Sequence, residues 1–140
     1  MVSVMNNQLL ELKEPLEDDE QMQVVQFLEL NHLKFTAVPN STYTTSWKQK
    51  NHNTAMGLRA GFPDLIILIP PNVSLDGLGH FLPLEMKRRK TFKVSEDQKS
   101  WISALNGLGI KEIDSVIAHG ADEAIEYIAS FLKHPIAVGN

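Results

Sequence analysis

Two segments, GFPDLIILIP at residues 61–70 and FLPLEMKRRK at residues 81–90, indicate the fold of this chain. The first contains the near-continuous apolar run DLIILI, which predicts a buried strand. The second predicts another strand, FLPLEMK, in which Pro83 favours a sheet edge or a bulge because proline has no amide hydrogen for a ladder. A turn-rich connection containing Asp76 and Gly77 joins the two runs. The region therefore predicts two strands separated by a hairpin-length gap.

The remaining elements follow from capping residues and hydrophobic spacing on either side of these strands. Ser95 and Gln98 have the spacing of a capping box, which marks the start of a helix. Residues 40–61 are polar without helical or strand periodicity, which predicts a long loop that is either functional or disordered. The expected order is αβββαβα, an α/β fold, with helices over residues 18–31, 95–107 and 121–133 and strands over residues 34–39, 64–69, 81–87 and 114–118.

The composition bounds the class of protein. A chain of 140 residues is about the size of one domain, and 43 % hydrophobic with 21 % charged residues excludes a disordered or collagen-like chain. The absence of cysteine excludes disulfides and a cysteine nucleophile and fits a reducing compartment. No apolar run approaches the ~20 residues that span a bilayer, and residues 1–12 lack the pattern of a signal peptide. We therefore expect a cytoplasmic domain without a membrane partner.

Charge is distributed unevenly along the chain, although the formal net charge is only −4. Residues 1–33 hold one lysine and seven acidic residues, residues 34–99 hold ten Lys or Arg and five acidic residues, and residues 100–140 hold two lysines and five acidic residues. A polyanion can bind such a basic middle segment, because the local field matters more than the net charge. A solvated basic face is the alternative, and charge alone favours it.

Three side chains around the two central strands suggest chemistry. Glu85 and Lys87 are two residues apart in a strand and therefore share a face, while Met86 points to the opposite one. If the strands pair antiparallel, Asp64 at the start of one lies beside this pair. Two neighbouring carboxylates repel unless a cation lies between them, and Mg²⁺ or Mn²⁺ prefers such oxygens, to which the Met86 carbonyl can add another. The alternative is a strand-end Glu–Lys ion pair with an unrelated Asp, which spacing alone favours.

The same residues carry a family resemblance. Pro63-Asp64 followed by Glu85-Met86-Lys87 resembles the PD-(D/E)xK nuclease signature. Together with VSEDQKSW at residues 94–101, the context over residues 18–131 resembles the virus-type replication-repair nuclease (VRR-NUC) family. The resemblance implies a restriction-endonuclease-like core with a mixed central sheet flanked by helices. It also implies Mg²⁺- or Mn²⁺-dependent hydrolysis of phosphodiester bonds in DNA, without an organic cofactor.

The resemblance also implies an organisation and a biological setting. It places a single nuclease domain over residues 18–133, after an acidic lead-in at residues 1–17 and before a tail at residues 134–140. Small stand-alone members are typical of phages, are similar to Holliday-junction resolvases and act as homodimers. We therefore expect branched or double-stranded DNA as the substrate, in a bacterial or phage-infected cytoplasm.

Carried over residue by residue, the resemblance makes Asp64 and Glu85 metal ligands and Lys87 the catalytic lysine. Glu20 matches the acidic position of the family's first helix and is expected at the metal, with Glu17 as the less favoured alternative. Without the resemblance, Glu20 is simply an acid at the positive end of a helix. Gln98 matches the glutamine that opens the second helix, where it supports the lysine or a water; its other reading is the capping partner of its helix.

Basic and polar residues around these positions are expected to bind DNA phosphates independently of sequence. For each of them, a solvated or packing role is the alternative. Tyr43 and Trp47, in the long loop, are candidates for contact with a splayed base. The expected DNA-binding residues are Asn40, Lys48, Lys50, Arg59, Arg88, Arg89, Lys90 and Lys93.

The leading hypothesis is a metal-dependent, structure-selective DNA endonuclease. The alternatives are a catalytically inactive DNA-binding or interaction module on a nuclease fold, and a restriction-type or RNA-cleaving nuclease without junction preference.

Overall fold

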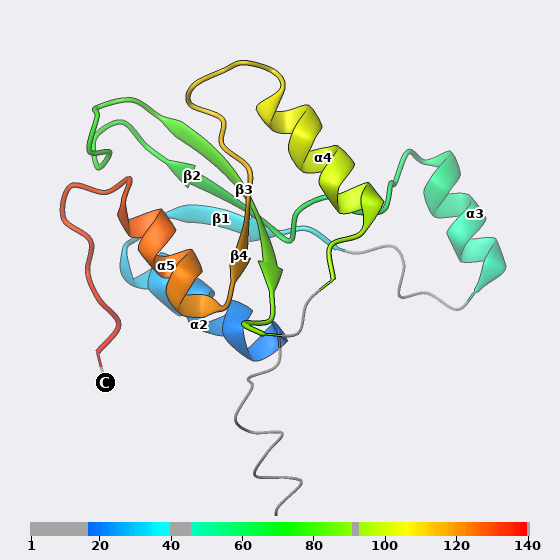
Figure 1. Cartoon of the computed structure of the whole chain (residues 1–140), viewed down its shortest axis with the longest axis horizontal. Coiled ribbons are helices and arrows are strands. Elements are labelled where there is room, and N and C mark those ends of the chain that lie inside the picture. Colours follow the sequence, from blue (N-terminus) through cyan, green and yellow to red (C-terminus); the bar gives the residue numbers. More distant parts are fainter. Residues whose placement is uncertain (1–16, 40–45, 91–92, 140) are drawn as a thin grey trace, which may run out of the picture.

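The computed structural model describes residues 17–39, 46–90 and 93–139, and Figure 1 shows their arrangement. The chain folds as one mixed sheet with helices around it, which confirms the expected α/β class. None of the helices in these ranges is long and apolar enough to cross a membrane. In chain order the elements are α2 (Glu17–Leu30), β1 (Lys34–Ala37), α3 (Trp47–Ala55), β2 (Leu65–Ile69), β3 (His80–Lys87), α4 (Glu96–Asn106), β4 (Val116–His119) and α5 (Ala121–Ala129).

The sheet has the strand order β1-β2-β3-β4. β1 pairs antiparallel with β2, β2 pairs antiparallel with β3, and β4 lies parallel to β3. The parallel pair requires a crossover, which α4 supplies between β3 and β4. The two apolar runs recognised in the sequence are therefore the two central strands of the sheet.

One face of the sheet forms the hydrophobic core against α2 and α5, which also pack against each other. Side chains at alternate positions of β2 and β3 point to this face, as strand geometry requires. The continuous apolar run of β2 predicted a strand buried on both faces. Only the core face is fully buried, and Leu68 on the other face is 39 % exposed. The fully buried members from the two strands are Leu65, Ile67, Leu82, Leu84 and Met86.

Pro83 lies in the central strand β3, not at an edge. Phe81 N–H and C=O both bond to the segment that leads into β4, and the Pro83 carbonyl accepts a hydrogen bond from Ser115 Oγ at 2.8 Å on the same side. The missing amide hydrogen of Pro83 therefore faces the stretch between the isolated Phe81–Ile113 bridge and the start of β4 at Val116. Proline is tolerated here because the β3–β4 ladder is interrupted beside it.

A helix, α3, occupies part of the segment that was expected to be a loop. Ser46 caps it, with its Oγ accepting a hydrogen bond from Gln49 N–H at 3.2 Å, and no residue of the helix is buried. Hydrophobic periodicity reports a buried face, so a helix without one leaves no periodic signal in the sequence.

The last helix, α5, ends at Ala129, before the expected boundary at residue 133. The chain then runs alongside the β2–β3 connection. Leu132 forms an isolated β-bridge with Ser74, and the Lys133 N–H donates to the Val73 carbonyl. Further on, the Ile136 N–H donates to Asn31 Oδ1 at 2.7 Å, at the end of α2. The segment after α5 is thus joined to the body of the domain.

Candidate active site

The strand pairing brings the three predicted catalytic side chains together. Leu65 of β2 faces Leu84 of β3, so Asp64 lies beside the end of β3, where Glu85 and Lys87 project on the same face. Asp64 Oδ2 accepts a hydrogen bond from the Met86 N–H at 2.8 Å, which ties the acid directly to the neighbouring strand. The antiparallel pairing that the sequence analysis assumed is therefore present.

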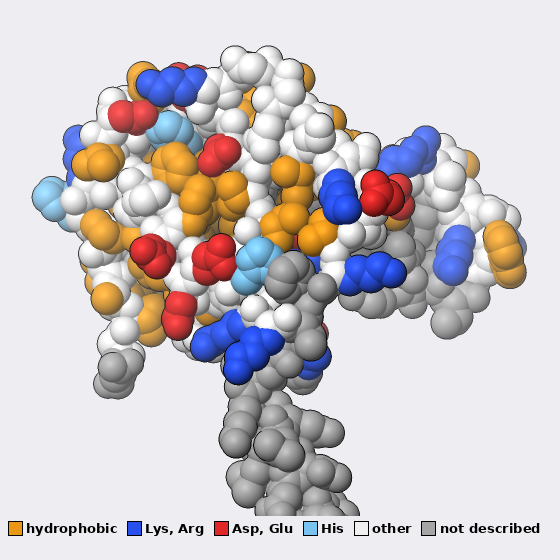
Figure 2. Space-filling model, in the orientation of Figure 1, with side chains coloured by type: hydrophobic (Ala, Val, Ile, Leu, Met, Phe, Trp, Pro, Cys, Tyr) orange, Lys and Arg blue, Asp and Glu red, His pale blue; other side chains and the backbone are white. Residues whose placement is uncertain are grey.

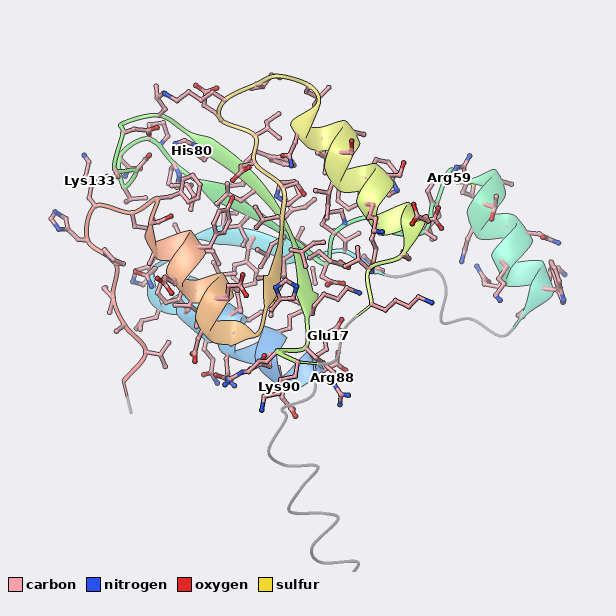
Figure 3. All side chains as sticks on the ribbon, in the orientation of Figure 1. Glu17, Arg59, His80, Arg88, Lys90 and Lys133 are labelled. Carbon is pink, nitrogen blue, oxygen red and sulfur yellow. The ribbon has the colours of Figure 1, made fainter. Side chains whose placement is uncertain are left out.

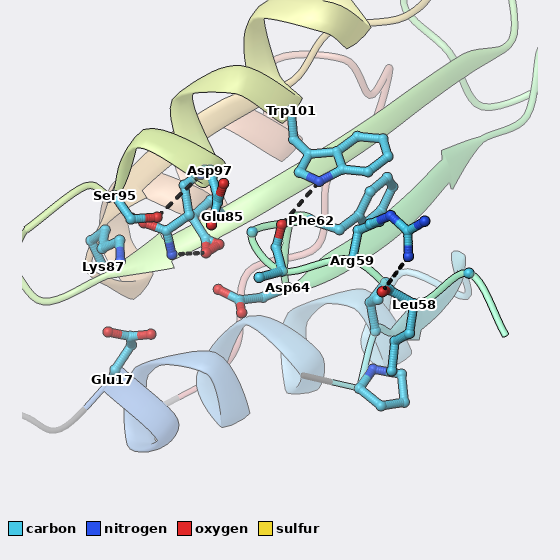
Figure 4. Close-up of a pocket in the computed structure, with 16 residues that line it drawn as sticks. Glu17, Leu58, Arg59, Phe62, Asp64, Glu85, Lys87, Ser95, Asp97 and Trp101 are labelled. Carbon is cyan, nitrogen blue, oxygen red and sulfur yellow. Dashed lines mark hydrogen bonds between the residues drawn. The ribbon is translucent and has the colours of Figure 1, made fainter. Parts of the chain in front are cut away.

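These side chains line a pocket of about 620 Å³ at the end of the sheet. Figure 4 shows Asp64, Glu85 and Lys87 at its base, with Glu17 approaching from α2 on the other side. Glu85 and Lys87 are nearly buried, at 3 % and 8 % exposure. Charged groups withdrawn this far from water must be paired, hold an ion or become neutral through a shifted pKa.

It is costly for Asp64 and Glu85 to carry their negative charges at the same time. Burial, together with the charge of Asp64, raises the pKa of Glu85 to about 9. Burial also raises the pKa of Asp64, although the hydrogen bond from the Met86 amide opposes this rise. Glu85 Oε2 is buried and accepts no hydrogen bond from the described residues, and the Glu85 side chain interacts directly with that of Asp64. An unpartnered buried carboxylate oxygen beside a second carboxylate is what a hard divalent cation would satisfy.

The Met86 carbonyl has a position consistent with a further ligand. Extending the β2–β3 register past Leu65 and Leu84 sets Met86 opposite Pro63. Residues that face each other in this way in an antiparallel ladder normally exchange two hydrogen bonds. Pro63 has no amide hydrogen, so it donates no hydrogen bond to the Met86 carbonyl. Among the residues that the structure describes, no group of three or more His, Cys, Asp or Glu side chains is placed to hold a metal ion.

Gln98 is the capping partner of its helix and also contacts the site, at Glu85. Its Oε1 accepts a hydrogen bond from the Ser95 N–H at 3.0 Å, which completes the capping box of α4. Its Nε2 donates to Glu85 Oε1 at 2.9 Å. The Gln98 side chain thereby holds Oε1 of Glu85 and makes no hydrogen bond to Oε2.

The rim of the pocket contains residues to which the sequence analysis gave no role. Trp101 of α4 donates from Nε1 to the Ala60 carbonyl at 3.1 Å and packs edge-on against Phe62, with ring centroids 5.0 Å apart. Gly61 has φ +92, and a Cβ there would lie 2.6 Å from the Asp97 backbone. The glycine of the GFPD segment was the available signal, since only glycine permits both this conformation and this approach.

Glu20 is not where the resemblance placed it. Its carboxylate is fully buried and accepts from Arg89 Nε at 2.9 Å, with Arg89 Nη2 at 2.8 Å, and it does not line the pocket. Glu17, one turn earlier on α2, lines the pocket instead. Burial raises the Glu17 pKa, and the charge of Lys87 opposes the rise. The acid that α2 presents to the site is therefore Glu17, and Glu20 forms an internal ion pair.

The predicted DNA-binding residues lie in two groups. Figure 3 shows Arg59 beside α3, and Arg88 with Lys90 beyond the end of β3 near Glu17. Lys48 and Lys50 are exposed on α3, and Lys93 is exposed before α4. Figure 2 shows Lys and Arg side chains on α3 and below the end of β3. Arg89 is committed to Glu20, and Asn40 and Tyr43 lie outside the described residues.

Comparison with known proteins agrees with this geometry. The family model of the VRR-NUC domain matches residues 6–122. No curated protein sequence matches the chain. A solved structure titled "VRR_NUC domain protein" superposes with a TM-score of 0.62 at 23 % identity, covering 84 % of this chain and 88 % of that chain, which shows a shared fold. The chain therefore belongs to the VRR-NUC domain family, which has a nuclease fold and a DNA-processing function.

Proposed function

We propose that this protein is a DNA endonuclease that hydrolyses phosphodiester bonds with Mg²⁺ or Mn²⁺ held by Asp64 and Glu85. One observation carries the proposal: buried Glu85 and half-buried Asp64 share a pocket with Lys87, and Glu85 Oε2 accepts no hydrogen bond from the described residues. Family membership supports it, because nucleases of this kind generally use divalent metals. The Met86 carbonyl is the proposed third oxygen ligand.

The residues of the pocket divide the work of hydrolysis. A bound divalent ion supplies Lewis-acid polarisation of the phosphoryl group and lowers the pKa of a water. Lys87 is buried beside both carboxylates, where its ammonium can orient the attacking water and offset charge in the transition state. Gln98 orients Glu85, and Glu17 adds a negative charge at the pocket edge that favours a cation.

Branched DNA is the proposed substrate and a homodimer the proposed active form. Figure 3 shows Arg59 beside α3 and Arg88 with Lys90 near Glu17, and both Arg59 and Glu17 line the pocket. This arrangement supports a DNA strand running across the pocket between the two basic groups. Cutting a junction symmetrically needs two active sites, and a two-fold dimer supplies them. Light scattering with and without junction DNA tests the dimer; a monomer under both conditions contradicts it.

A cleavage assay tests the activity directly. Junction, flap, linear duplex and single-stranded DNA are incubated with Mg²⁺, Mn²⁺ or EDTA, using wild type, Asp64→Asn, Glu85→Gln and Lys87→Ala. We expect metal-dependent cutting by wild type, with the junction preferred, and loss of cutting in all three variants with DNA binding kept in Lys87→Ala. DNA binding by wild type without cutting of any substrate supports the inactive binding module instead.

A further inference from the structure

The helix α3 stands apart from the rest of the molecule (Figure 1). It lies between β1 and β2 in the chain, and none of its nine residues is buried. Its order comes from local contacts: the Ser46 cap, a Gln49–Asn53 side-chain hydrogen bond of 2.7 Å, and Arg59 Nη1 donating to the Thr54 carbonyl at 2.9 Å. A helix this short is marginal in water without a packed face, so a binding partner would stabilise it.

The chemistry of the segment selects the kind of partner. No acidic residue occurs from residue 30 to residue 63, whereas this stretch contains Lys34, Lys48, Lys50 and Arg59. The helix has no continuous apolar stripe for a hydrophobic groove. Its apolar side chains are Trp47, which is 78 % exposed at the first position, and Ala55 at the last, and the rest are lysines, amides, a histidine and a threonine. A polar, basic, acid-free helix suits a polyanion better than a protein surface.

The positions of the two lysines suit a groove. Lys48 and Lys50 are two residues apart, which is about 200° around a helix, so they project from nearly opposite flanks. Between them, one arc carries Gln49, His52 and Asn53, and the other carries Trp47, Asn51, Thr54 and Ala55. An α-helix is roughly 10–12 Å wide, and the major groove of duplex DNA is about 12 Å wide with phosphates along both walls. A helix lying in that groove can direct one lysine to each wall and amides to the base edges.

The helix is also joined to the pocket by a braced connection. Arg59 donates to the Thr54 carbonyl at the end of α3 and itself lines the pocket. The next residue, Ala60, accepts from Trp101 of α4, and Gly61 lies against the first turn of α4. A duplex held by α3 is therefore kept at a set position relative to Asp64.

We propose that α3 binds in a groove of double-stranded DNA adjoining the scissile phosphate, so that the substrate must carry a duplex segment on that side. This inference rests on the proposed function and specifies which part of a branched substrate the protein holds. A single strand offers no groove with two phosphate walls, so the contribution of α3 is specific to duplex.

Binding measured in EDTA tests the inference without cleavage. The variant Lys48→Gln/Lys50→Gln is compared with Lys111→Gln/Lys133→Gln, which changes the net charge equally at exposed lysines outside α3. Affinities for a duplex and for one of its single strands are measured over a salt series. All four lysines are exposed, so thermal melting should show both variants folded. For the α3 variant, we expect the slope of log K against log salt on duplex to be shallower by about 1.8, the loss of two phosphate contacts.

The outcomes separate the two proposals. Weaker duplex binding by the α3 variant, with single-strand binding close to wild type and the control variant unchanged on both, supports the groove contact. Equal losses on duplex and single strand, or a loss no larger than the control's, overturns it while leaving the nuclease proposal intact. Failure of wild type to bind any DNA overturns both.

Discussion

The Gln98 side-chain amide joins a helix cap to the candidate active site: its Oε1 accepts from Ser95 N–H at 3.0 Å while its Nε2 donates to Glu85 Oε1 at 2.9 Å. One side chain therefore sets both the start of α4 and the orientation of an acidic residue on β3. A substitution of Gln98 should therefore affect both the stability of the fold and the geometry of the candidate site, and separate variants can distinguish the two effects.

Substituting Gln98 and Ser95 separately distinguishes these effects. Ser95→Ala removes the hydroxyl cap but leaves the amide on Glu85, whereas Gln98→Ala removes its capping bond and the contact with Glu85. We expect each variant to lose about 1 kcal/mol of stability. Only Gln98→Ala should also lose cleavage or metal affinity, by roughly 10- to 100-fold, as for other residues that orient metal ligands. Urea denaturation and cleavage rates provide the measurements; equal activity of the two variants contradicts the orienting role.

The raised pKa of Glu85 predicts an unusual pH dependence for the metal-free protein. The folded protein keeps a proton on Glu85 up to a pKa of about 9, whereas the unfolded chain releases it near the ordinary value of 4.5. Stability is therefore greatest below pH 4.5 for this group and falls as pH rises toward 9, by at most about 1.4 kcal/mol per pH unit.

Glu85→Gln should remove this contribution, because an amide does not ionise. In EDTA, we expect the variant to be more stable than wild type at pH 8 and to lose less stability between pH 6 and pH 9. Urea denaturation at several pH values measures these stabilities. Addition of Mn²⁺ should stabilise wild type but not the variant. Parallel pH profiles for the two proteins in EDTA would show that Glu85 is not the group responsible.

The ion pair between buried Glu20 and solvent-exposed Arg89 predicts a stability effect away from the pocket. Arg89→Ala leaves the fully buried Glu20 carboxylate without its cation, which should cost about 2 kcal/mol, less than the loss from a fully buried pair because the Arg89 side chain is 43 % exposed. The double variant Glu20→Leu/Arg89→Met should recover most of that loss, since neither charge remains buried. Arg88→Ala is the matched control, one residue away and outside the pair. A loss in Arg88→Ala equal to that in Arg89→Ala, by urea denaturation, would be inconsistent with this assignment.

Substitutions at two glycines near the pocket can distinguish the energetic cost of backbone strain from that of a steric clash. Gly57 and Gly61 both have positive φ, +98 and +92, but a Cβ at Gly57 meets nothing within 4 Å, whereas one at Gly61 meets the Asp97 backbone at 2.6 Å. Gly57→Ala should cost only the conformational strain, of order 1 kcal/mol. Gly61→Ala should cost more and also lower cleavage, because it pushes α4, with Gln98, away from Glu85. Thermal melting and cleavage rates of both variants check this, and equal effects would argue against close packing at Gly61.

Much of the fold could be predicted because its signals are local. The strands β2 and β3 are apolar runs bounded by proline, glycine and charged residues, and the Ser95–Gln98 spacing marked the start of α4. The helix α3 could not be predicted in this way, since it buries no residue and so has no periodic pattern. Pro83 was expected at a sheet edge or a bulge. It lies in a central strand, and the interruption that accommodates it is in the pairing with β4.

The sequence by itself determined the central strands and the shared face of Glu85 and Lys87, because side chains two apart in a strand share a face whatever the rest of the fold does. Asp64 joined them only through the family resemblance and an assumed antiparallel pairing, which the tertiary structure supplies. Only the tertiary structure decided between Glu17 and Glu20. These acids lie three residues apart and share a face of α2, so no local pattern separates them. The choice is made by Arg89, 69 residues away in the chain, which pairs with Glu20 and leaves Glu17 to the pocket.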